Sequence, residues 1–374
     1  MHERYIWQLP FWPDLRWDEQ ALLTPLGEVR YAQGKLYGAL DAIGFEDSRQ
    51  ELEVESLVEE AVTTSAIEGE QLPRKAVRSS VARRLGLSTA GLPAPSRSVD
   101  GVVEVLLDAT ANFEKPLTLK RLKGWQAALF PGGYSGMNKI RVGQWRTGPM
   151  QVVSGPHGNE RIHFEAPPAE VVNEEVKRFL QWWKNSPGRL HGVIRAGIAH
   201  LRFETIHPFE DGNGRVGRVL ADMALAQAEA QPRRFYSLSA QVLEERDEYY
   251  RNLEKVQKGN GEITGWILWF LGCLERSLER SQLQVQKALV RTRFWQHLAG
   301  QDLNSRQAKA VDRLLEAGKD GFEGGLSNAK YRRMTKAAKV TASRDLADLV
   351  QRGIMIRKGE GRATRYDLNW TLGG

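Results

Sequence analysis

Apolar residues recur at spacings of three and four along most of the chain, which is the spacing of one face of an α-helix. In the stretch 190–205, Val193, Ile194, Ile198 and Leu201 follow this spacing and indicate an amphipathic core helix. The same pattern predicts further helices over 21–40, 52–63, 125–130, 216–223 and 275–298. The chain is therefore predicted to be mainly α-helical.

A β-prone segment interrupts the helical pattern near the middle of the chain. Two short runs, 150–154 and 161–164, flank a turn rich in glycine, proline and asparagine. This arrangement is typical of a β-hairpin. At the other end of the chain, Trp7, Trp12 and Trp17 indicate a segment that covers a neighbouring surface, in which each indole N–H needs a partner.

From residue 304 the pattern changes to three short helices and a hairpin. Asn304 is predicted to cap the first helix, the second covers 330–339, and Thr341 is predicted to cap the third, which ends at Gly353. The runs 354–356 and 366–368 then flank a turn. Three helices followed by a basic hairpin resemble a winged helix.

Charge is unevenly placed along the chain. Residues 301–374 hold 15 Lys plus Arg against 9 Asp plus Glu, so +6 of the net charge of +7 lies there. This excess indicates an acidic partner. If the partner is DNA, its phosphates are expected at Arg344, Arg357, Lys358, Arg362 and Arg365. The alternative is that this module docks onto its own chain or onto a second copy.

Composition is ordinary for a soluble globular protein, with 41% hydrophobic and 26% charged residues. A chain of 374 residues is expected to form two or three domains. No apolar run approaches the roughly 20 residues of a membrane helix, and the first residues lack a signal-peptide pattern, so we expect a cytoplasmic protein. The single cysteine, Cys273, lies in an apolar run and is expected to be a buried, inert thiol.

The stretch from His207 to Arg218 concentrates the groups needed to bind a metal triphosphate. Two glycines flank an asparagine, and a glycine lets the backbone approach a ligand because it has no Cβ. Apolar residues recur at helical spacing from Val216, so residues 212–215 are predicted at a helix N-terminus, which favours phosphate. Arg215 and Arg218 can each fork onto phosphate oxygens.

Two side chains in this stretch suit the chemistry of transfer. His207 precedes Pro208, which favours an extended conformation at the loop entrance. Its imidazole, with an ordinary pKa of roughly 6.5, can accept a proton from a hydroxyl near neutral pH. Asp211 is the carboxylate beside the glycines, and Mg²⁺ on phosphates usually takes one or two such ligands. The alternative for His207 is an ordinary loop histidine.

These residues, H-P-F-E-D-G-N-G-R-V-G-R, resemble the signature of Fic (Fido-fold) proteins, H-x-F-x-D/E-G-N-G-R-x-x-R, at every fixed position. The resemblance implies a Fic helical core and transfer of AMP from ATP to a hydroxyl side chain of a target protein. It implies that His207 is the base, that Asp211 holds Mg²⁺ and that Arg218 grips the γ-phosphate. The other signature positions are implied to surround the phosphates of ATP: Gly212, Asn213, Gly214, Arg215, Val216 and Gly217.

A shorter motif precedes the core, from Thr64 to Gly69. It resembles the Fic inhibitory motif, S/T-x-x-x-E-G/N, and the surrounding region resembles the helical segment found ahead of the Fic core in bacterial proteins. This implies that Glu68 pairs with Arg218, takes the guanidinium that the γ-phosphate needs and keeps the enzyme inactive, while Gly69 ends the helix. The alternative is a Glu68 that is merely solvated.

The hairpin at 150–164 resembles the Fic flap, which covers the nucleotide and pairs with the target's backbone by β-augmentation. The residues implied to lie nearest the nucleotide are Ser154, Gly155, Pro156 and His157. His157 and His163 are expected to be hairpin surface residues, with metal ligation as the alternative. Further on, the segment 249–257 resembles the family's adenine wall, with Tyr249 or Tyr250 for stacking and Gln257 for hydrogen bonding. Many Fic proteins have asparagine at the last position, and either tyrosine can equally be a core residue.

The expected organisation is an N-terminal helical region with the inhibitory helix over 1–110, a Fic domain over 117–274, a connecting helix over 275–299 and a winged-helix-like domain over 300–374. Two classes of function follow. One is a protein adenylyltransferase autoinhibited by Glu68. The other is a DNA-binding regulator whose Fic-like core senses nucleotide, although a sensor has no need of His207.

A Fic core can also use another phosphate-containing donor, such as one that supplies UMP or phosphocholine, or remove AMP. The expected small molecules are ATP as substrate and Mg²⁺. The expected partners are target proteins on the flap, the protein itself as a target, a second copy in a homodimer, and DNA on the C-terminal domain. No membrane partner is expected.

Overall fold

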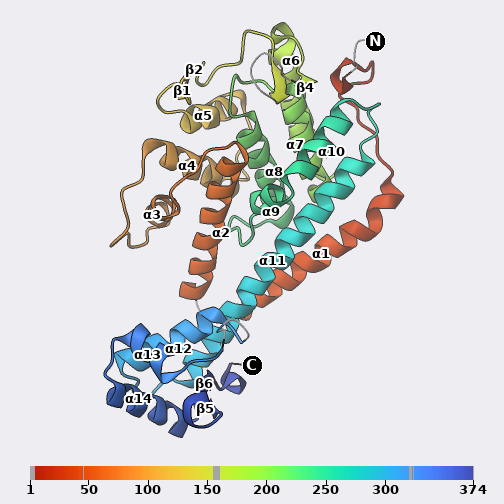
Figure 1. Cartoon of the computed structure of the whole chain (residues 1–374). Coiled ribbons are helices and arrows are strands. Elements are labelled where there is room, and N and C mark those ends of the chain that lie inside the picture. Colours follow the sequence, from red (N-terminus) through yellow and green to blue (C-terminus); the bar gives the residue numbers. More distant parts are fainter. Residues whose placement is uncertain (1–4, 45, 155–160, 320–321, 323, 374) are drawn as a thin grey trace. The chain divides into compact units, whose positions relative to one another are not determined.

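The computed structural model of this chain describes residues 5–44, 46–154, 161–319, 322 and 324–373. The chain folds into two compact units, one with the residues up to Gly34 and 51–281, and the other with 35–50 and 282–374. Helices make up most of both units, as the sequence pattern predicts (Figure 1). The fold is therefore mainly α.

The first unit holds most of the helices and two small hairpins. The helices α1, α2 and α11 contribute residues to both units. The elements are η1 (Ile6–Gln8), α1 (Glu19–Asp41), α2 (Glu46–Ile67), α3 (Arg74–Arg84), α4 (Arg97–Ala111), α5 (Leu119–Leu129), β1 (Tyr134–Ser135), β2 (Asn138–Lys139), β3 (Gln151–Ser154), β4 (Arg161–Glu165), η2 (Ala169–Val171), α6 (Val172–Asn185), α7 (Gly192–Ile206), α8 (Asn213–Glu229), α9 (Leu238–Glu244), α10 (Arg246–Gln257) and α11 (Thr264–His297).

The helices α7 and α8 form the centre of this unit, and α8 also contacts α4 and α5 (Figure 1). Val193 and Phe203 on α7 are fully buried, which confirms the predicted core helix. The two helices approach closely at Gly192, because a Cβ there would lie 2.3 Å from the Cβ of Ala228. The helices are also close beside the loop that joins them, because a Cβ at Gly217 would lie 2.5 Å from the Oε1 atom of Glu204. That loop begins the stretch 207–218.

The predicted hairpin is present as β3 and β4, which pair antiparallel. Val153 faces Ile162 and Val152 faces Phe164, so the register shifts between the two pairs and leaves one extra residue on β4. Such a bulge bends the strand and redirects a side chain. The extra residue is His163.

The N-terminal tryptophans cover the region next to this hairpin. The indole N–H of Trp7 donates to the carbonyl oxygen of Glu165 at 2.7 Å. The indole N–H of Trp12 donates to the Glu175 carboxylate at 2.8 Å. Both partners agree with the expectation of an aromatic segment that lies on a neighbouring surface.

The helix predicted over 275–298 begins earlier than expected. It is α11, which starts at Thr264 and continues through the apolar run around Cys273. The sequence pattern leaves 264–274 unassigned. Glycine has a low helix propensity, but burial of side chains such as Trp266 and Leu274 outweighs the cost of Gly265 and Gly272. Cys273 is buried, as predicted, and burial raises the pKa of its thiol.

The second unit contains three short helices and a hairpin with their own core. The elements are α12 (Ser305–Ala317), α13 (Asn328–Thr335), α14 (Lys339–Gln351), β5 (Met355–Lys358), η3 (Gly361–Ala363), β6 (Arg365–Leu368) and η4 (Trp370–Leu372). Leu314, Leu346, Ile354 and Leu368 are among the residues that fill the core. The predicted order of three helices and a hairpin is confirmed.

Two capping predictions for these helices had opposite outcomes. Asn304 caps α12, where its side chain accepts from the backbone N–H groups of Arg306 and Gln307. Thr341 does not cap α14, because the helix already begins at Lys339 and its N-cap is Ala338. The residues at the actual start of α14 have side chains that cannot cap a helix. Thr341 is the first residue there with a hydroxyl group, so the prediction placed the cap too late.

Within the described ranges, every helix is too short or too polar to cross a lipid bilayer.

Candidate functional site

The loop between α7 and α8 is shaped by its own backbone and side chains. His207 ends α7 with φ at 48°, and its N–H donates to the carbonyl oxygen of Phe203. The expected extended conformation before Pro208 is therefore wrong, because closing the helix with a left-handed residue outweighs the preference set by proline. Gly212, with φ at 87°, is the N-cap residue directly before α8.

Asn213 holds this loop together. Its side-chain oxygen accepts from the Phe209 N–H, and its amide donates to the Phe209 carbonyl oxygen, both at 2.9 Å. Both polar ends of the side chain are thus used within the loop. A ligand can therefore bind to the backbone N–H of Asn213, which lies in the first turn of α8 and has no partner inside the helix.

The loop forms one wall of a cavity of about 530 Å³. The flap strands form a second wall and α10 forms a third. The sequence-predicted site residues that line it include Glu68, Ser154, His207, Asp211, Gly212, Asn213, Gly214, Tyr249, Tyr250 and Gln257. Gly155, Pro156 and His157 lie outside the described residues. The structure therefore brings most of the predicted residues together around a single space.

His207 lies in this cavity as a neutral imidazole. Its Nδ1 lies 3.2 Å from the carbonyl oxygen of Glu204, which can only accept, so Nδ1 carries the proton and Nε2 keeps its lone pair. Burial lowers the pKa of His207 to about 4. Burial also raises the pKa of the Glu204 carboxyl to about 8. An imidazole of this kind is available as a proton acceptor throughout the neutral pH range.

Arg218 is buried and tied to the end of α2. It donates to the Glu68 carboxylate at 2.7 Å, to the Thr64 hydroxyl at 2.8 Å and to the Thr64 carbonyl oxygen at 2.9 Å. Burial has the largest single effect on the pKa of Glu68 and would raise it. The charge and the hydrogen bond of Arg218 and the charge of Arg215 act together in the opposite direction, and the net effect lowers that pKa. The expected ion pair of Arg218 and Glu68 is present, and Thr64 adds two hydrogen bonds to the same guanidinium.

Glu68 also lies against the first turn of α8. A Cβ at Gly214 would lie 2.2 Å from the Oε1 atom of Glu68. The glycine therefore lets a carboxylate oxygen reach the helix N-terminus, where a phosphate oxygen is equally suited. Gly69, with φ at 83°, turns the chain directly after Glu68.

A second ion pair, which sequence reasoning missed, joins the same two segments. Arg215 donates to the Glu70 carboxylate at 2.9 Å and stacks 4.7 Å over the ring of Phe130. Both arginines of the signature are thus held by carboxylates in the turn that follows α2, and Arg218 is also held by Thr64 in the last turn of that helix. The signal available in the sequence was a second carboxylate directly after Gly69.

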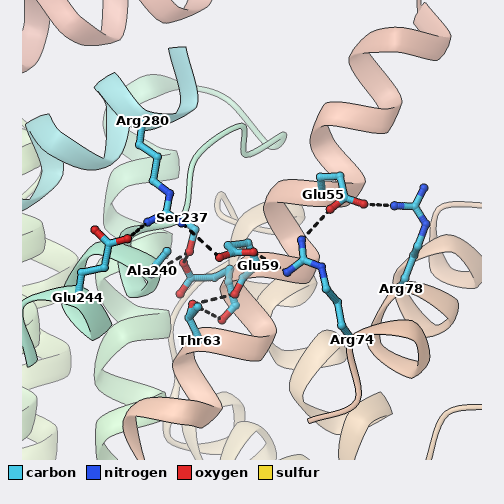
Figure 2. A network of polar contacts seen from close by, with 10 residues as sticks. Glu55, Glu59, Thr63, Arg74, Arg78, Ser237, Ala240, Glu244 and Arg280 are labelled. Carbon is cyan, nitrogen blue, oxygen red and sulfur yellow. Dashed lines mark hydrogen bonds and ion pairs between the residues drawn. The ribbon is translucent and has the colours of Figure 1, made fainter. Parts of the chain in front are cut away.

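The helix α2 is anchored along its length by contacts within the first unit (Figure 2). From α3, Arg74 donates to Glu55 at 2.7 Å and to Glu59 at 2.5 Å. From the other side, the Ser237 hydroxyl donates to Glu60 at 2.7 Å. These contacts fix the helix just before the turn that carries Glu68.

Asp211 lies at the cavity edge with both carboxylate oxygens in hydrogen bonds. One accepts from the Gly212 N–H at 2.5 Å and the other accepts from the Ser135 hydroxyl. No group of three or more His, Cys, Asp or Glu that could hold a metal is found among the described residues. A single oriented carboxylate suits Mg²⁺, which takes its other ligands from phosphates and water.

The two tyrosines of the predicted adenine wall have different surroundings. Tyr249 is buried, and its hydroxyl pairs with His200 Nε2 at 2.9 Å within an aromatic cluster. Tyr250 is 36% exposed at the cavity. Gln257 is buried beside Thr205. Tyr250 is thus the better placed of the two to stack on a ligand.

His163 on the flap has partners that sequence reasoning did not foresee. Its Nε2 lies 2.6 Å from the Ser154 hydroxyl, and its Nδ1 lies 2.8 Å from the Glu254 carboxylate on α10. His163 was expected to be a hairpin surface residue, but the bulge in β4 turns it onto these two groups. All three side chains line the cavity.

Comparisons with protein families match two segments of the chain. Residues 116–225 match the Fic/DOC family, and residues 5–87 match a domain of unknown function, DUF4172. A protein adenylyltransferase Fic from Nematostella vectensis is 32% identical over 122 residues, which are 32% of this chain and 26% of that protein. A uridine 5'-monophosphate transferase from Xanthomonas campestris is 30% identical over 116 residues, which are 29% of this chain and 21% of that protein. The chain thus matches only a minor part of the length of these relatives.

Solved structures match over a larger part of the chain. A Fic family protein from Desulfovibrio desulfuricans has a TM-score of 0.55 at 19% identity and covers 94% of this chain and 97% of its own. A Fic domain containing signaling protein from Bacteroides thetaiotaomicron has a TM-score of 0.52 at 18% identity, with 70% and 96% covered. At these identities the likeness concerns the fold alone.

Proposed function

Residues 116–225 of this chain belong to the Fic/DOC family, and from that premise we propose that the protein transfers AMP from ATP to a hydroxyl side chain of a target protein. One observation carries the proposal. A neutral His207 with a free Nε2 lies in the same cavity as the N-terminus of α8, so a proton acceptor and a phosphate site are neighbours.

The cavity has the size and the groups that ATP requires. Its volume of about 530 Å³ lies within the range of small-molecule sites. The first backbone N–H groups of α8, from Asn213 onward, have no partner inside the helix and favour a phosphate. Tyr250 can stack on the base, and Asp211 would hold Mg²⁺, which neutralises phosphate charge when bound.

In the proposed reaction, the target hydroxyl gives its proton to His207 Nε2 while its oxygen bonds to the α-phosphorus of ATP. The bond between that phosphorus and the bridging oxygen breaks, and diphosphate leaves. Arg215 and Arg218 stabilise the negative charge on the leaving group once they are free of their carboxylates. The Glu204 carbonyl keeps the imidazole in the required tautomer.

We propose that Glu68 keeps this reaction switched off. Its carboxylate holds Arg218 and lies against Gly214, where phosphate oxygens of ATP would bind. A carboxylate and a phosphate cannot occupy one place, so productive binding requires Glu68 to leave. Autoinhibition follows from this competition.

Target proteins are proposed to dock on the flap. The hairpin of β3 and β4 has only two strands, and Val153 and Ile162 are 47% and 42% exposed. An extended segment can add to such a hairpin through main-chain hydrogen bonds, with apolar side chains against these two residues.

Labelled ATP tests the proposal directly. The Glu68→Gly variant, incubated with ATP labelled in its α-phosphate, Mg²⁺ and a cell lysate, is expected to leave label on protein. ATP labelled in its γ-phosphate should leave no more label than the same lysate receives without the protein, because diphosphate departs. A parallel incubation with UTP tests the donor that the Xanthomonas relative suggests, and label from UTP alone would replace AMP by UMP in the proposal.

A second candidate function is DNA binding by the second unit. Arg332, Arg333 and Arg344 on α13 and α14 are exposed and form no ion pair among the described residues. Their charge suits a phosphate backbone. Fluorescence anisotropy with a DNA duplex should show affinity that falls steeply between 50 and 200 mM salt. Absent or salt-insensitive binding would instead favour docking onto the chain itself or a second copy.

A further inference from the structure

We propose that Ser154, His163 and Glu254 form a second acceptor site in the cavity, in which Ser154 itself receives AMP and His163 takes its proton. This inference rests on the proposed function for its donor, ATP. It differs from that function in the hydroxyl that is modified and in the base that activates it.

The three side chains form a continuous hydrogen-bonded relay. The Ser154 hydroxyl lies 2.6 Å from His163 Nε2, and His163 Nδ1 lies 2.8 Å from the Glu254 carboxylate. A nucleophile, a base and a group that orients the base are the parts needed to activate a serine hydroxyl. The spacing places each within hydrogen-bond reach of the next.

The local fold explains why His163 faces this way. In a regular antiparallel pair, side chains alternate between the two faces of the hairpin. The bulge opposite Val152 and Val153 adds His163 as an extra residue and so redirects its ring. Without the bulge, the residues beyond it would be paired in another register and His163 would have a cross-strand partner of its own.

The carboxylate of Glu254 fixes the tautomer of His163. Glu254 also accepts from Arg161 at 3.1 Å and from Lys258 at 3.2 Å. Burial alone would raise the pKa of Glu254, but these donors together with His163 lower it, so the carboxylate is ionised and only accepts. His163 Nδ1 therefore carries a proton, and Nε2 is left to accept from the Ser154 hydroxyl.

The position of Ser154 brings its hydroxyl to the same space as the proposed nucleotide. Ser154 ends β3 and lines the cavity together with His207 and the first turn of α8. Once Glu68 has left the proposed phosphate site, the relay and the nucleotide would share this one cavity. Ser154 competes with outside hydroxyls for the same donor.

In the proposed step, Ser154 is the nucleophile, His163 is the base and diphosphate is the leaving group. The Ser154 oxygen bonds to the α-phosphorus of ATP, and the bond from that phosphorus to the bridging oxygen breaks and releases diphosphate. The proton of the Ser154 hydroxyl goes to His163 Nε2. The resulting imidazolium is stabilised by the Glu254 carboxylate.

Peptide mapping by mass spectrometry tests the inference on the full chain in the Glu68→Gly background. With ATP and Mg²⁺, AMP is expected on the peptide that contains Ser154. Adding His163→Gln should lower modification of that peptide by a factor of about 10² to 10⁴, the usual contribution of a positioned base. Adding Glu254→Gln should lower it less, and Ser88→Ala, which removes an exposed hydroxyl elsewhere, should leave it unchanged.

Combining Glu68→Gly with His207→Ala separates the two bases. Label on lysate proteins should be lost while AMP remains on Ser154. AMP on other hydroxyls but never on Ser154 would overturn this inference and leave the proposed function intact. Modification of Ser154 that survives His163→Gln would also overturn it, because His207 would then be the base. Absence of AMP from every protein would overturn both.

Discussion

His207 and His163 line different walls of one cavity, and their surroundings differ in burial and in charge. His207 is mostly buried, with 16% of its side chain exposed, and its Nδ1 donates to a neutral carbonyl oxygen. His163 is 25% exposed, and its Nδ1 donates to a carboxylate. Both rings therefore keep Nε2 as the accepting atom, but only His163 has a charged partner.

The two walls also differ in whether their polar side chains already have partners in the absence of a ligand. On the wall of His207, the neighbouring arginines are already paired with Glu68 and Glu70, so the proposed phosphate site would first have to be vacated. On the flap, Ser154 and His163 are already in contact. On the wall of His207, the proposed base is present but the arginines beside it are occupied. On the flap, the hydrogen bond between Ser154 and His163 is already formed, but that wall has no phosphate site of its own.

Removing the base from the first wall should have the largest effect. His207→Ala in the Glu68→Gly background is expected to lower transfer to lysate proteins by about 10² to 10⁴, because no other group replaces Nε2 at that position. Nucleotide binding, measured by calorimetry, should change little. His297→Ala, an exposed histidine of the second unit, is the control. Wild-type labelling by His207→Ala would show that the base has been misassigned.

Opening the closed site should have the next largest effect. Glu68→Gly is expected to raise transfer by about 10 to 100-fold, because a charge-assisted pair worth about 1.5 to 3 kcal/mol no longer competes with phosphate. Initial rates with α-labelled ATP measure this. Arg218→Ala alone, or combined with Glu68→Gly, should show no such gain, because the γ-phosphate then lacks its anchor.

The second ion pair should have a smaller effect than the first. Glu70 is 41% exposed in its side chain, and a pair with such a partner contributes up to about 1 kcal/mol. Glu70→Gln should therefore raise transfer by about two- to fivefold at most. Glu28→Gln, which removes an exposed carboxylate on α1, is the control. A gain as large as that of Glu68→Gly would mean that Arg215 limits binding as much as Arg218 does.

The smallest change is expected from pH. Because the pKa of His207 is lowered to about 4, the ring is neutral at pH 6 as well as at pH 8. A histidine with an ordinary pKa would lose about three quarters of its neutral form between these values. The rate of AMP transfer by the Glu68→Gly variant should thus differ by less than about twofold between pH 6 and pH 8. A fourfold fall at pH 6 would show that the ring is not desolvated during turnover.

The same shift has a consequence for stability. Folding favours the neutral form of His207, so this group contributes stability above its unfolded pKa of roughly 6.5. That contribution is lost as pH falls toward about 4. Glu204 has the opposite sign, because its raised pKa means that stability is lost as pH rises toward about 8.

The two walls also show what the sequence can predict. The first wall comes mainly from one contiguous stretch, 207–218, whose glycines and arginines have a recognisable order, and its partner Glu68 lies in a second short motif. The relay of Ser154, His163 and Glu254 joins residues far apart in the chain through a bulge, and no spacing rule places a bulge in advance. The Glu70 pair depends on the direction of the chain after Gly69, which is equally a tertiary property.

The elements were predictable to the extent that apolar spacing decided them. The helices α7 and α8 and the flap pairing follow from local pattern. The early start of α11 does not follow from local pattern. Packing around Trp266 stabilises the helix there, although glycine has a low helix propensity. The left-handed conformation of His207 does not follow from local pattern either. The hydrogen bond from its N–H to Phe203 closes the end of α7, and this outweighs the extended conformation that a residue before proline prefers.

The anchoring of α2 bears on the competition between Glu68 and ATP that we propose. A carboxylate in the turn directly after a helix held by Arg74 and Ser237 is an internal ligand with a fixed effective concentration at Arg218. That concentration does not change when the protein is diluted, unlike inhibition supplied by a second copy of the chain. ATP competes against it by its own concentration, so the fraction of active molecules would track the nucleotide supply rather than the amount of protein.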